Sequence, residues 1–340
     1  MRAFFAITLL FILSACADEV ELGTETSFSG STMGTTFTVK VIDLPKTLPA
    51  DEVQARLSEL LKGVNDKMSL WVKDSELVRF NTSNSTEWVE VSLDLFRVAA
   101  EAQRISAMTD GLFDVTIEPL IKLWGFSTKS MTRETPDESA LEAALKQVGY
   151  EKVSLRQEPP ALQKSNPEVT VNLSAIAKGF GIDVLSDYLE SQGIENYMVE
   201  IGGDLRVKGT NARREPWRIA IEKPDVTSRS VHRIVAVHGA GMATSGDYRN
   251  FFEKDGKRFT HIIDPRTGQP VTHRLASVTV LSQTAMTADG LATALLAMGE
   301  IAGPKLAEEN GIAAFFLIRE GEGFVEKRSS HFDVYENQVK

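Results

Sequence analysis

The 340-residue chain lacks several features that mark particular classes of protein. Its single cysteine, Cys16, excludes a disulfide framework and any zinc site built from several cysteines. It has no block of basic residues, and 37 Lys and Arg against 47 Asp and Glu give a net charge of −10. Because nucleic-acid binding requires clustered positive charge, this balance argues against a nucleic-acid partner. The content of 42% hydrophobic and 25% charged residues is typical of a globular protein.

Common catalytic motifs are also missing from the sequence. It contains no GxSxG nucleophile elbow, no P-loop and no HExxH zinc motif. The segment 239–244 approaches a dinucleotide fingerprint, but it lacks the third glycine and precedes no helical pattern. The five histidines, at positions 232, 238, 261, 273 and 331, show no metal-ligand spacing. Whatever the protein binds, it uses a less common arrangement of residues.

The first residues have the pattern of an export signal. Arg2 precedes an apolar run of 11 residues, 3–13, which is too short for a bilayer span of roughly 20 residues but suits a secretory signal. The sequence Leu-Ser-Ala-Cys that ends at Cys16 resembles a lipobox, the cleavage and lipidation signal of bacterial lipoproteins. The alternative is an ordinary signal peptide with an incidental cysteine.

These features predict three parts of the chain. Residues 1–15 are expected to be a signal peptide, and residues 16–29 a lipidated cysteine with a polar, acidic, flexible tether. Residues 30–340 are expected to be the folded body, held outside the cytoplasm, because no later segment is long and apolar enough to cross a membrane.

Hydrophobic periodicity predicts alternating strands and helices in the body. Strands are predicted over residues 35–42, 87–91, 169–173, 197–201, 217–222, 234–238, 259–263, 276–281 and 312–318. Helices are predicted over residues 51–68, 92–108, 135–149, 174–192 and 284–298, with Ser92, Ser174 and a capping box at Thr135 as start signals. The expected fold class is α/β (α+β), a single globular body of one or two lobes with mixed sheets and flanking helices.

Two segments carry residues suited to binding a cation or an anion. Asp289 and Thr293 are four residues apart on one face of an otherwise small and apolar helix, which suggests a Mg²⁺ or Ca²⁺ site or an Asp bonded to nearby amides. Ser174 precedes a helix whose free amides could hold an anion, with Lys178 adding charge; the alternative is a plain capped helix. Gly179 and Gly181 each weaken that helix by roughly 1 kcal/mol, which suggests a close approach to its backbone.

Three polar, turn-rich segments complete the candidates: residues 110–114, 244–250 and 260–268. Each alone is more typical of a turn than of a site. Together they place His, Asp, Arg and Tyr side chains near strand ends, where sites on α/β folds commonly lie.

Nine segments in this order resemble the FAD:protein FMN transferase family, the ApbE type. They are GSTMGTT (30–36), MSLW (68–71), SELVRFN (75–81), DGLFD (110–114), NLSAIAKG (172–179), VEIGGD (199–204), TSGDYRN (244–250), HIIDPRTG (261–268) and ADGLAT (288–293). Each motif alone is weak, but nine in sequence behind a lipobox are highly specific, and they cover nearly the whole body.

The resemblance implies an enzyme that binds FAD and a divalent metal. It implies transfer of the FMN half of FAD onto a Thr or Ser hydroxyl of an acceptor protein, through a phosphoester, with release of AMP. The implied acceptors are flavin-carrying subunits of membrane redox complexes of the Rnf and sodium-pumping quinone-reductase kind. Ala17 after the lipidated cysteine would permit export to the outer membrane, but the expected acceptors lie in the inner one. The expected location is therefore the periplasmic side of the inner membrane, reached through the lipid anchor.

The resemblance also assigns roles to individual residues. The residues that would line the FAD site are Met33, Trp71, Leu112, Phe113, Asp114, Asn172, Lys178 and Ile263. The Mg²⁺ would be held by the backbone carbonyl of Ala175 and the side chains of Asp289 and Thr293. Asn172 departs from the family pattern, where many members carry Asp, and this puts the flavin contacts in doubt rather than the metal site.

The chemistry of transfer suits these residue types. A cation is needed to screen the pyrophosphate of FAD, and a base is needed to take the proton of the acceptor hydroxyl. His261, with an ordinary pKa near 6.5, is the candidate base. Asp247 and Arg249 are candidate assistants that orient the base and hold the phosphate.

Two rival functions use the same residues. One is an FAD pyrophosphatase, in which water replaces the acceptor hydroxyl and FMN and AMP are released. The other is a non-catalytic FAD-binding lipoprotein, against which the metal ligands beside His261 argue.

Overall fold

The computed structural model describes residues 22–127, 135–225, 230–248, 250–254 and 257–337. The predicted signal peptide, Cys16 and the first part of the tether lie outside these residues. No helix within the described ranges is long and apolar enough to cross a membrane.

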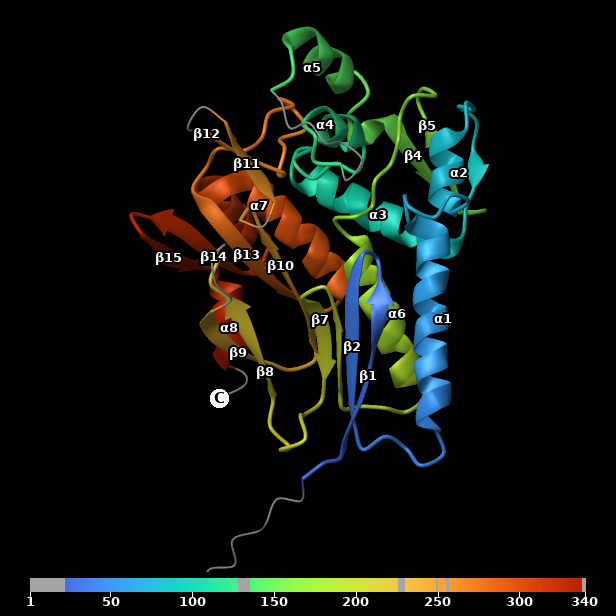
Figure 1. Ribbon diagram of the computed structural model, residues 1–340, viewed down its shortest axis with the longest axis vertical. Coiled ribbons are helices and arrows are strands. Elements are labelled where there is room, and N and C mark those ends of the chain that lie inside the picture. The colour runs from blue at the N-terminus through green and yellow to red at the C-terminus, as the bar shows by residue number, and fades with distance from the viewer. Residues whose placement is uncertain (1–21, 128–134, 226–229, 249, 255–256, 338–340) are drawn as a thin grey trace, which may run out of the picture.

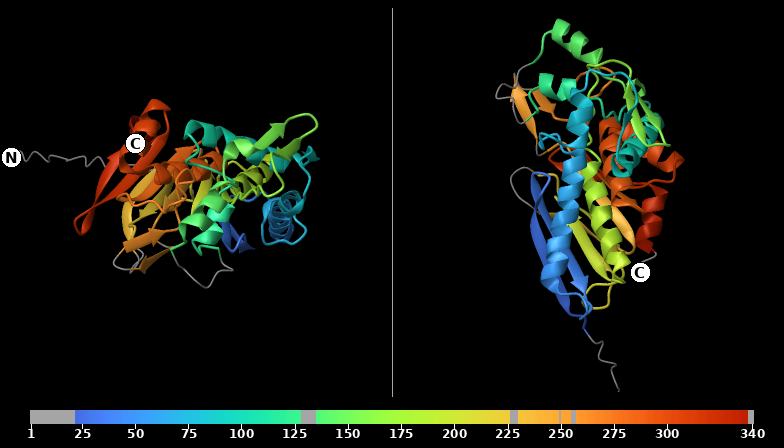
Figure 2. Two further views of the ribbon diagram at one scale, coloured as in Figure 1. Left: turned by 90° about the horizontal axis from the view of Figure 1, so that it is seen from above. Right: turned by 90° about the vertical axis from the view of Figure 1, so that its right-hand side faces the viewer.

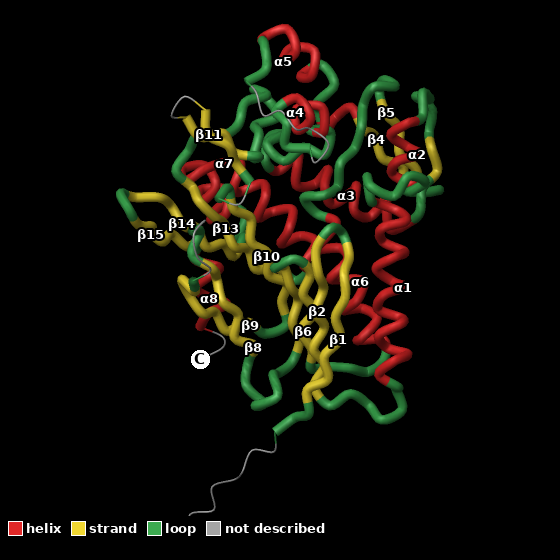
Figure 3. The backbone as a smooth tube through the Cα atoms, viewed as in Figure 1, coloured by secondary structure: helices red, strands yellow, loops and turns green. Residues whose placement is uncertain are grey.

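The largest element is an eight-stranded sheet in the order β1-β2-β6-β7-β10-β13-β14-β15 (Figures 1 and 3). All seven pairings within it are antiparallel. Its strands are β1 (Glu25–Thr32), β2 (Thr35–Ile42), β6 (Tyr197–Ile201), β7 (Asp204–Lys208), β10 (Ala240–Gly246), β13 (Leu275–Ser282), β14 (Ala313–Glu320) and β15 (Gly323–Arg328).

Three smaller antiparallel sheets surround it. The sheet β3-β5-β4 consists of β3 (Val89–Glu90), β5 (Ala161–Lys164) and β4 (Val153–Arg156). The two hairpins are β8 (Trp217–Glu222) with β9 (Val231–Val237), and β11 (Phe251–Lys254) with β12 (Lys257–Thr260).

Helices α1 (Ala50–Met68), α6 (Ala177–Ser191) and α7 (Ala285–Glu309) cover one face of the large sheet (Figure 2). Helix α7 packs against β10, β13 and β14, α6 packs against β6 and β7, and α1 packs against β1. The opposite face is covered by the β8–β9 hairpin and by α8 (Ser330–Asn337), around a buried cluster that includes Trp217, Phe315 and Phe332.

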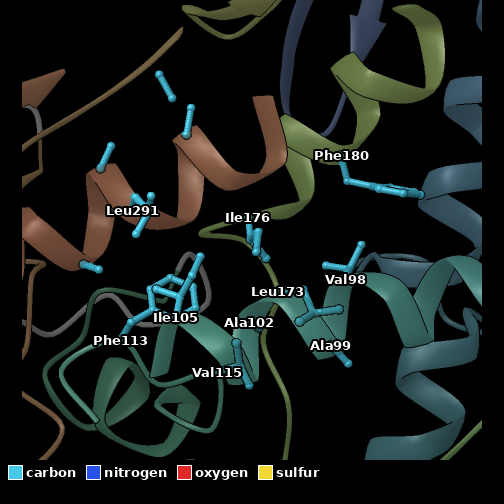
Figure 4. Close-up of a cluster of buried hydrophobic side chains, with 14 of the residues drawn as sticks. Val98, Ala99, Ala102, Ile105, Phe113, Val115, Leu173, Ile176, Phe180 and Leu291 are labelled. Carbon is cyan, nitrogen blue, oxygen red and sulfur yellow. The ribbon is translucent and has the colours of Figure 1, made fainter. Parts of the chain in front are cut away.

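A second group of elements lies above the sheet in Figure 1: α2 (Glu76–Thr82), α3 (Leu93–Met108), α4 (Glu118–Leu123), α5 (Glu138–Leu145), the 3₁₀ turn Tyr150–Lys152 and the three-stranded sheet. Its core is continuous with that of the sheet, because Ile105 and Phe113 pack in one cluster with Ile176 and Leu291 (Figure 4). The predicted α+β class with flanking helices is confirmed.

Several predicted helix ends are also found. Ser92 caps α3 by accepting a hydrogen bond from the amide of Leu95 at 3.2 Å, and Thr284 caps α7 by accepting one from the amide of Thr287 at 3.2 Å. Such caps satisfy amides that have no partner within the helix. Helix α5 differs, because its cap is Asp137 rather than Thr135.

Two predictions near the site are wrong in detail. Residues 169–173 form no strand, and the side chain of Asn81 pairs with the backbone of Val171 where a neighbouring strand would. Residues 174–176 form a turn, so α6 begins at Ala177 with Ile176 as its N-cap, and Ser174 is not the cap.

The expected tether is also too long. Residues 25–29 belong to β1 and pair with residues 38–42 of β2. The buried ring of Phe28, 4% exposed, holds this segment to the core, so the folded body begins before residue 30.

Candidate active site

A cavity of about 480 Å³ is lined by residues of the upper group of elements and of the large sheet. Asp289 and Thr293 line it from α7, Ser245 lines it from β10, and His261 lines it just after β12. The cavity therefore brings together the predicted metal ligands and the predicted base from segments that are distant in sequence.

Most of the residues assigned to the FAD site line the same cavity. They are Leu112, Phe113, Asp114, Asn172, Lys178 and Ile263, together with Ala175 of the expected metal site. Apolar side chains thus form one part of the wall and charged groups another, which is the usual make-up of a ligand pocket.

Met33 and Trp71 line a separate, smaller hollow of about 110 Å³. Ser174 and Lys178 line both hollows, so the two are neighbours. The side chain of Trp71 is 63% exposed, which leaves its ring face accessible to a flat ligand. An extended ligand such as a dinucleotide can occupy both hollows across Lys178.

Lys178 is fixed between two carboxylates rather than solvated. Its Nζ lies 2.6 Å from Oδ2 of Asp204 and 3.0 Å from Oδ1 of Asp289, and Oδ2 of Asp289 accepts the amide of Gly179 at 3.1 Å. Burial alone disfavours the ammonium group, but the two carboxylates outweigh it and raise the pKa of Lys178. Burial raises the pKa of Asp204 despite the opposing effect of Lys178.

Gly179 shows why a small residue is needed early in α6. A Cβ atom at this position would lie 2.3 Å from the carbonyl oxygen of Ala285, so no larger residue fits without moving α7. This close approach of α6 and α7 lets the carboxylate of Asp289 reach Lys178. Helix packing thus explains the predicted close contact at Gly179, whereas a Cβ atom at Gly181 would meet the side chain of Met33 at 2.9 Å.

The chemistry of the donor set fits a hard divalent cation. Asp289 offers a carboxylate, Thr293 a hydroxyl and Ala175 a backbone carbonyl, and all three residues line the cavity. The hydroxyl of Thr293 is held 3.0 Å from that of Ser245. Across the described ranges no three His, Cys, Asp or Glu side chains group for a metal. Oxygen donors of this kind are the ligands that hard cations prefer.

The ring of His261 is held by one backbone atom. The carbonyl oxygen of Asn250 lies 2.9 Å from Nδ1 of His261 and also accepts the His261 amide at 3.1 Å. Because a carbonyl only accepts hydrogen bonds, Nδ1 carries the proton and Nε2 keeps its lone pair. Burial lowers the pKa of His261, partly opposed by the Asn250 contact and Asp247, so the ring is neutral at pH 7.

Asp247 does not orient His261 by direct contact. Its carboxylate, 4% exposed, accepts both terminal nitrogens of the Arg319 guanidinium. Asp247 therefore acts on the base only at a distance. Arg249, the other expected assistant, lies outside the described residues.

Asp114 and Asn172 are held in place by their neighbours. Oδ1 of Asp114 accepts the amide and the hydroxyl of Thr116 at 2.7 and 2.6 Å, while burial raises the pKa of Asp114. The side-chain nitrogen Nδ2 of Asn172 donates to Oε2 of Glu118 at 2.6 Å. An amide suits this position because an Asp here would face the carboxylate of Glu118.

Some cavity residues were not singled out as ligands from the sequence. Ser245, Tyr248 and Asn250 line it from the segment 244–250, which was recognised only as polar and turn-rich. Ala220 and Glu222 line it from β8, and no sequence signal points to them.

Comparison with known proteins agrees with this arrangement. The model of the ApbE family matches residues 33–316. The FAD:protein FMN transferases of Vibrio cholerae and Haemophilus influenzae are 47% and 45% identical to the chain, over 96% of it in both cases and over 96% and 95% of their own lengths.

Solved structures give the same result. The flavin transferase ApbE from Vibrio cholerae aligns with a TM-score of 0.86 at 46% identity, over 92% of this chain and 99% of that one. The apo flavinyl transferase ApbE from Pseudomonas stutzeri aligns with a TM-score of 0.84 at 37% identity, over 93% of this chain and 98% of that one. By family model, sequence identity and fold, the chain belongs to the ApbE family.

Proposed function

We propose that the chain is an FAD:protein FMN transferase that moves the FMN half of FAD onto a Thr or Ser hydroxyl of an acceptor protein. The curated relatives that carry this activity in their names match nearly the full chain. The observation that carries the proposal is the neutral His261, with Nε2 available, in one cavity with Lys178, Asp289 and Thr293.

In this reaction Nε2 of His261 takes the proton of the acceptor hydroxyl as its oxygen attacks the phosphorus on the FMN side of the pyrophosphate. The new bond is the phosphoester between that oxygen and FMN. The bond that breaks joins this phosphorus to the bridging oxygen, which leaves with AMP. Burial supports this role because it lowers the pKa of His261 and keeps the base unprotonated at neutral pH.

Other residues of the chain bind and orient FAD. The apolar walls that include Phe113 and Ile263 suit a flavin ring, and the exposed ring of Trp71 in the neighbouring hollow suits a second aromatic system. Lys178 would meet the phosphates between the two ring systems, and the support is that it lines both hollows.

We propose that Asp289, Thr293 and the Ala175 carbonyl hold Mg²⁺. When bound, this ion screens the charge of the pyrophosphate and polarises its phosphorus. The support is the all-oxygen donor set and its place in the cavity.

The acceptors and location are further parts of the proposal. We propose flavin-carrying subunits of Rnf or sodium-pumping quinone reductase complexes as acceptors, and a lipid anchor at Cys16 on the periplasmic side of the inner membrane. A Cys16→Ala chain should then appear in the soluble periplasmic fraction. Retention of that variant in the membrane would contradict the anchor.

Mass spectrometry of each acceptor subunit, incubated with the enzyme, FAD and Mg²⁺, tests the transfer. We expect a gain of one FMN that is lost with EDTA, with Asp289→Ala, or when the target Thr becomes Val. Steady AMP release without an adduct on either subunit would indicate a pyrophosphatase instead. Bound FAD with neither product would indicate a binding protein.

A further inference from the structure

The face of β10 that packs against α7 carries small side chains. Ala243 is buried in the cluster that this helix shares, and a Cβ atom at Gly241 would lie 2.5 Å from the amide of Ala285. Because side chains alternate along a strand, Ser245 shares this face with them. Packing requires only that residue 245 be small, and alanine is smaller than serine. The hydroxyl of Ser245 therefore calls for a chemical explanation.

The hydroxyl of Thr293, on α7, is turned differently from other hydroxyls on helices of this protein. Those of Thr82, Ser106 and Ser186 donate to the carbonyl oxygen four residues earlier, at 2.8, 2.8 and 2.9 Å. A Ser or Thr inside a helix commonly makes this bond. Within the described part of the chain, the hydroxyl of Thr293 has one hydrogen-bond partner, the hydroxyl of Ser245 at 3.0 Å. Ser245 thus draws this hydroxyl away from the helix backbone.

The hydroxyl that is drawn away is the one expected to bind the metal. A hydroxyl has one proton and two lone pairs, and an oxygen that gives a lone pair to a cation directs its proton elsewhere. Either hydroxyl of the Ser245–Thr293 pair can be the donor, so Ser245 can accept the proton of Thr293. Groups that orient metal ligands in this way contribute to metal affinity without touching the metal.

We infer that Ser245 is a positioning residue for Mg²⁺ binding: its oxygen accepts the proton of the Thr293 hydroxyl and so keeps a lone pair of Thr293 directed into the cavity. Both residues line that cavity, together with Asp289 and Ala175. The inference rests on the metal site of the proposed function.

The orientation of Thr293 can be measured without any metal. In full-length chain labelled with ¹³C at the threonine methyl carbons, three-bond couplings to the backbone report the χ1 angle, and Thr293→Val assigns the signal. We expect χ1 of Thr293 in Ser245→Ala to move to the rotamer in which the hydroxyl donates to the carbonyl of Asp289. An unchanged χ1 in Ser245→Ala would overturn the inference whether or not Mg²⁺ binding or transfer is observed.

Isothermal titration with Mg²⁺ in the presence of FAD is the second measurement. We expect Ser245→Ala to lower the affinity for Mg²⁺ about tenfold or more, while the affinity for FAD without Mg²⁺ stays unchanged. An equal loss of FAD affinity without Mg²⁺ would show that Ser245 acts on FAD instead. Thr279→Val is the matched control, because it removes a hydroxyl that pairs at 2.8 Å with Thr244 across the same two strands, β10 and β13. That variant should leave the affinity for Mg²⁺ unchanged.

Double variants separate positioning from direct ligation. If Ser245 acts through the hydroxyl of Thr293, adding Ser245→Ala to Thr293→Val should lower the affinity for Mg²⁺ no further. Multiplied losses would show that Ser245 is itself a ligand. The exchanged pair, Ser245→Thr with Thr293→Ser, keeps both hydroxyls and the total volume and should retain most of the affinity. A loss in that pair as large as in Ser245→Ala would show that packing matters rather than the hydroxyl.

Asp289→Ala distinguishes failure of this inference from failure of the proposed metal site. Loss of Mg²⁺ affinity in Asp289→Ala but not in Ser245→Ala would overturn the role of Ser245 alone. Unchanged affinity in both variants would overturn the metal site itself, and the role of Ser245 with it.

Discussion

Nζ of Lys178 lies 3.0 Å from Oδ1 of Asp289, although the two residues are 111 positions apart. The contact joins α6 to α7 at the wall of the cavity. With Asp204 bound to the same ammonium group, two carboxylates share one positive charge in a buried place. A buried excess of negative charge is costly, and a divalent cation bound on the cavity side would relieve it. The ion pair and the proposed metal site are therefore parts of one charge balance.

Thr293 is the cleaner probe of the proposed metal site, because Asp289 also anchors Lys178 and Gly179. Thr293→Val keeps the shape of the side chain but removes the hydroxyl, so we expect about tenfold or greater loss of Mg²⁺ affinity. Thr293→Ser keeps the hydroxyl and should retain most of the affinity. Isothermal titration with Mg²⁺ in the presence of FAD checks both. Equal affinity of the Val and Ser variants would exclude Thr293 as a ligand.

His261→Ala should bind FAD normally but lose transfer by about 10²- to 10⁴-fold, the contribution of a general base. Equilibrium binding of FAD and mass spectrometry of the acceptor measure the two effects separately. Normal transfer by this variant would remove His261 from the mechanism.

The pH dependence of the native enzyme follows from the same residue. Burial lowers the pKa of His261 below 6.5, and the base works only when unprotonated. Single-turnover transfer should therefore fall as the pH is lowered, with its half-maximal point below pH 6.5. A half-maximal point above pH 6.5 would contradict a buried, neutral His261 as the base.

The sequence identified much of the site because its residues fall in short motifs. Asp289 and Thr293 were recognisable from helical spacing, and α7 indeed places both at one cavity. The ion pairs of Lys178 were not recognisable from the sequence. Its partners Asp204 and Asp289 come from other elements and become neighbours only when α6, α7 and β7 pack. Local patterns thus predict which residues matter but not which pairs form.

The errors in the fold have similar causes. Residues 169–173 have the composition of a strand, yet their backbone pairs with a side chain of α2 rather than with a strand. Strand β10 was missed because its small residues, such as Gly241, give no alternating hydrophobic pattern. A Cβ atom at Gly241 would lie 2.5 Å from the amide of Ala285, so the glycine is required by helix packing over the strand. Neither cause is visible in periodicity.

The buried carboxyl group of Asp114 should make the folded protein less stable as the pH rises. Burial raises its pKa in the folded state, so the folded chain holds the proton more tightly than the unfolded chain, whose pKa is near 3.8. Its contribution is present below that value and is lost as the pH rises through the folded pKa. The free energy of unfolding of Asp114→Asn minus that of the native chain should therefore rise with pH above 3.8.

Denaturant unfolding of both chains between pH 3.5 and 7 measures this difference. Asp137→Asn is the matched control, because the amide of Ala140 and the hydroxyl of Ser139 lower the pKa of Asp137. For this control, the free energy of unfolding of Asp137→Asn minus that of the native chain should fall as the pH rises. A flat difference for Asp114→Asn would mean that its pKa is the same in the folded and unfolded states.

Asn81 holds the segment that leads into the cavity. Its Oδ1 accepts the Val171 amide at 2.8 Å and its Nδ2 donates to the Val171 carbonyl at 2.8 Å, in place of a neighbouring strand. Of the residues that follow, Asn172, Ser174 and Ala175 line the cavity. Asn81→Ala leaves two backbone groups unpaired, so we expect the free energy of unfolding to fall by about 2 kcal/mol.

Because the same bonds place Asn172 and Ala175, FAD binding should weaken as well, by about fivefold, or roughly 1 kcal/mol. Asn310→Ala is the control, since Asn310 also donates to a backbone carbonyl, that of Leu306, but on an exposed helix end. That variant should change the free energy of unfolding by less than about 0.5 kcal/mol and leave FAD affinity unchanged. Chemical denaturation and FAD fluorescence titration measure the two quantities. If Asn81→Ala lowers stability but binds FAD like the native chain, the segment holds its shape without Asn81, and the cavity wall is fixed by α6 and α7 instead.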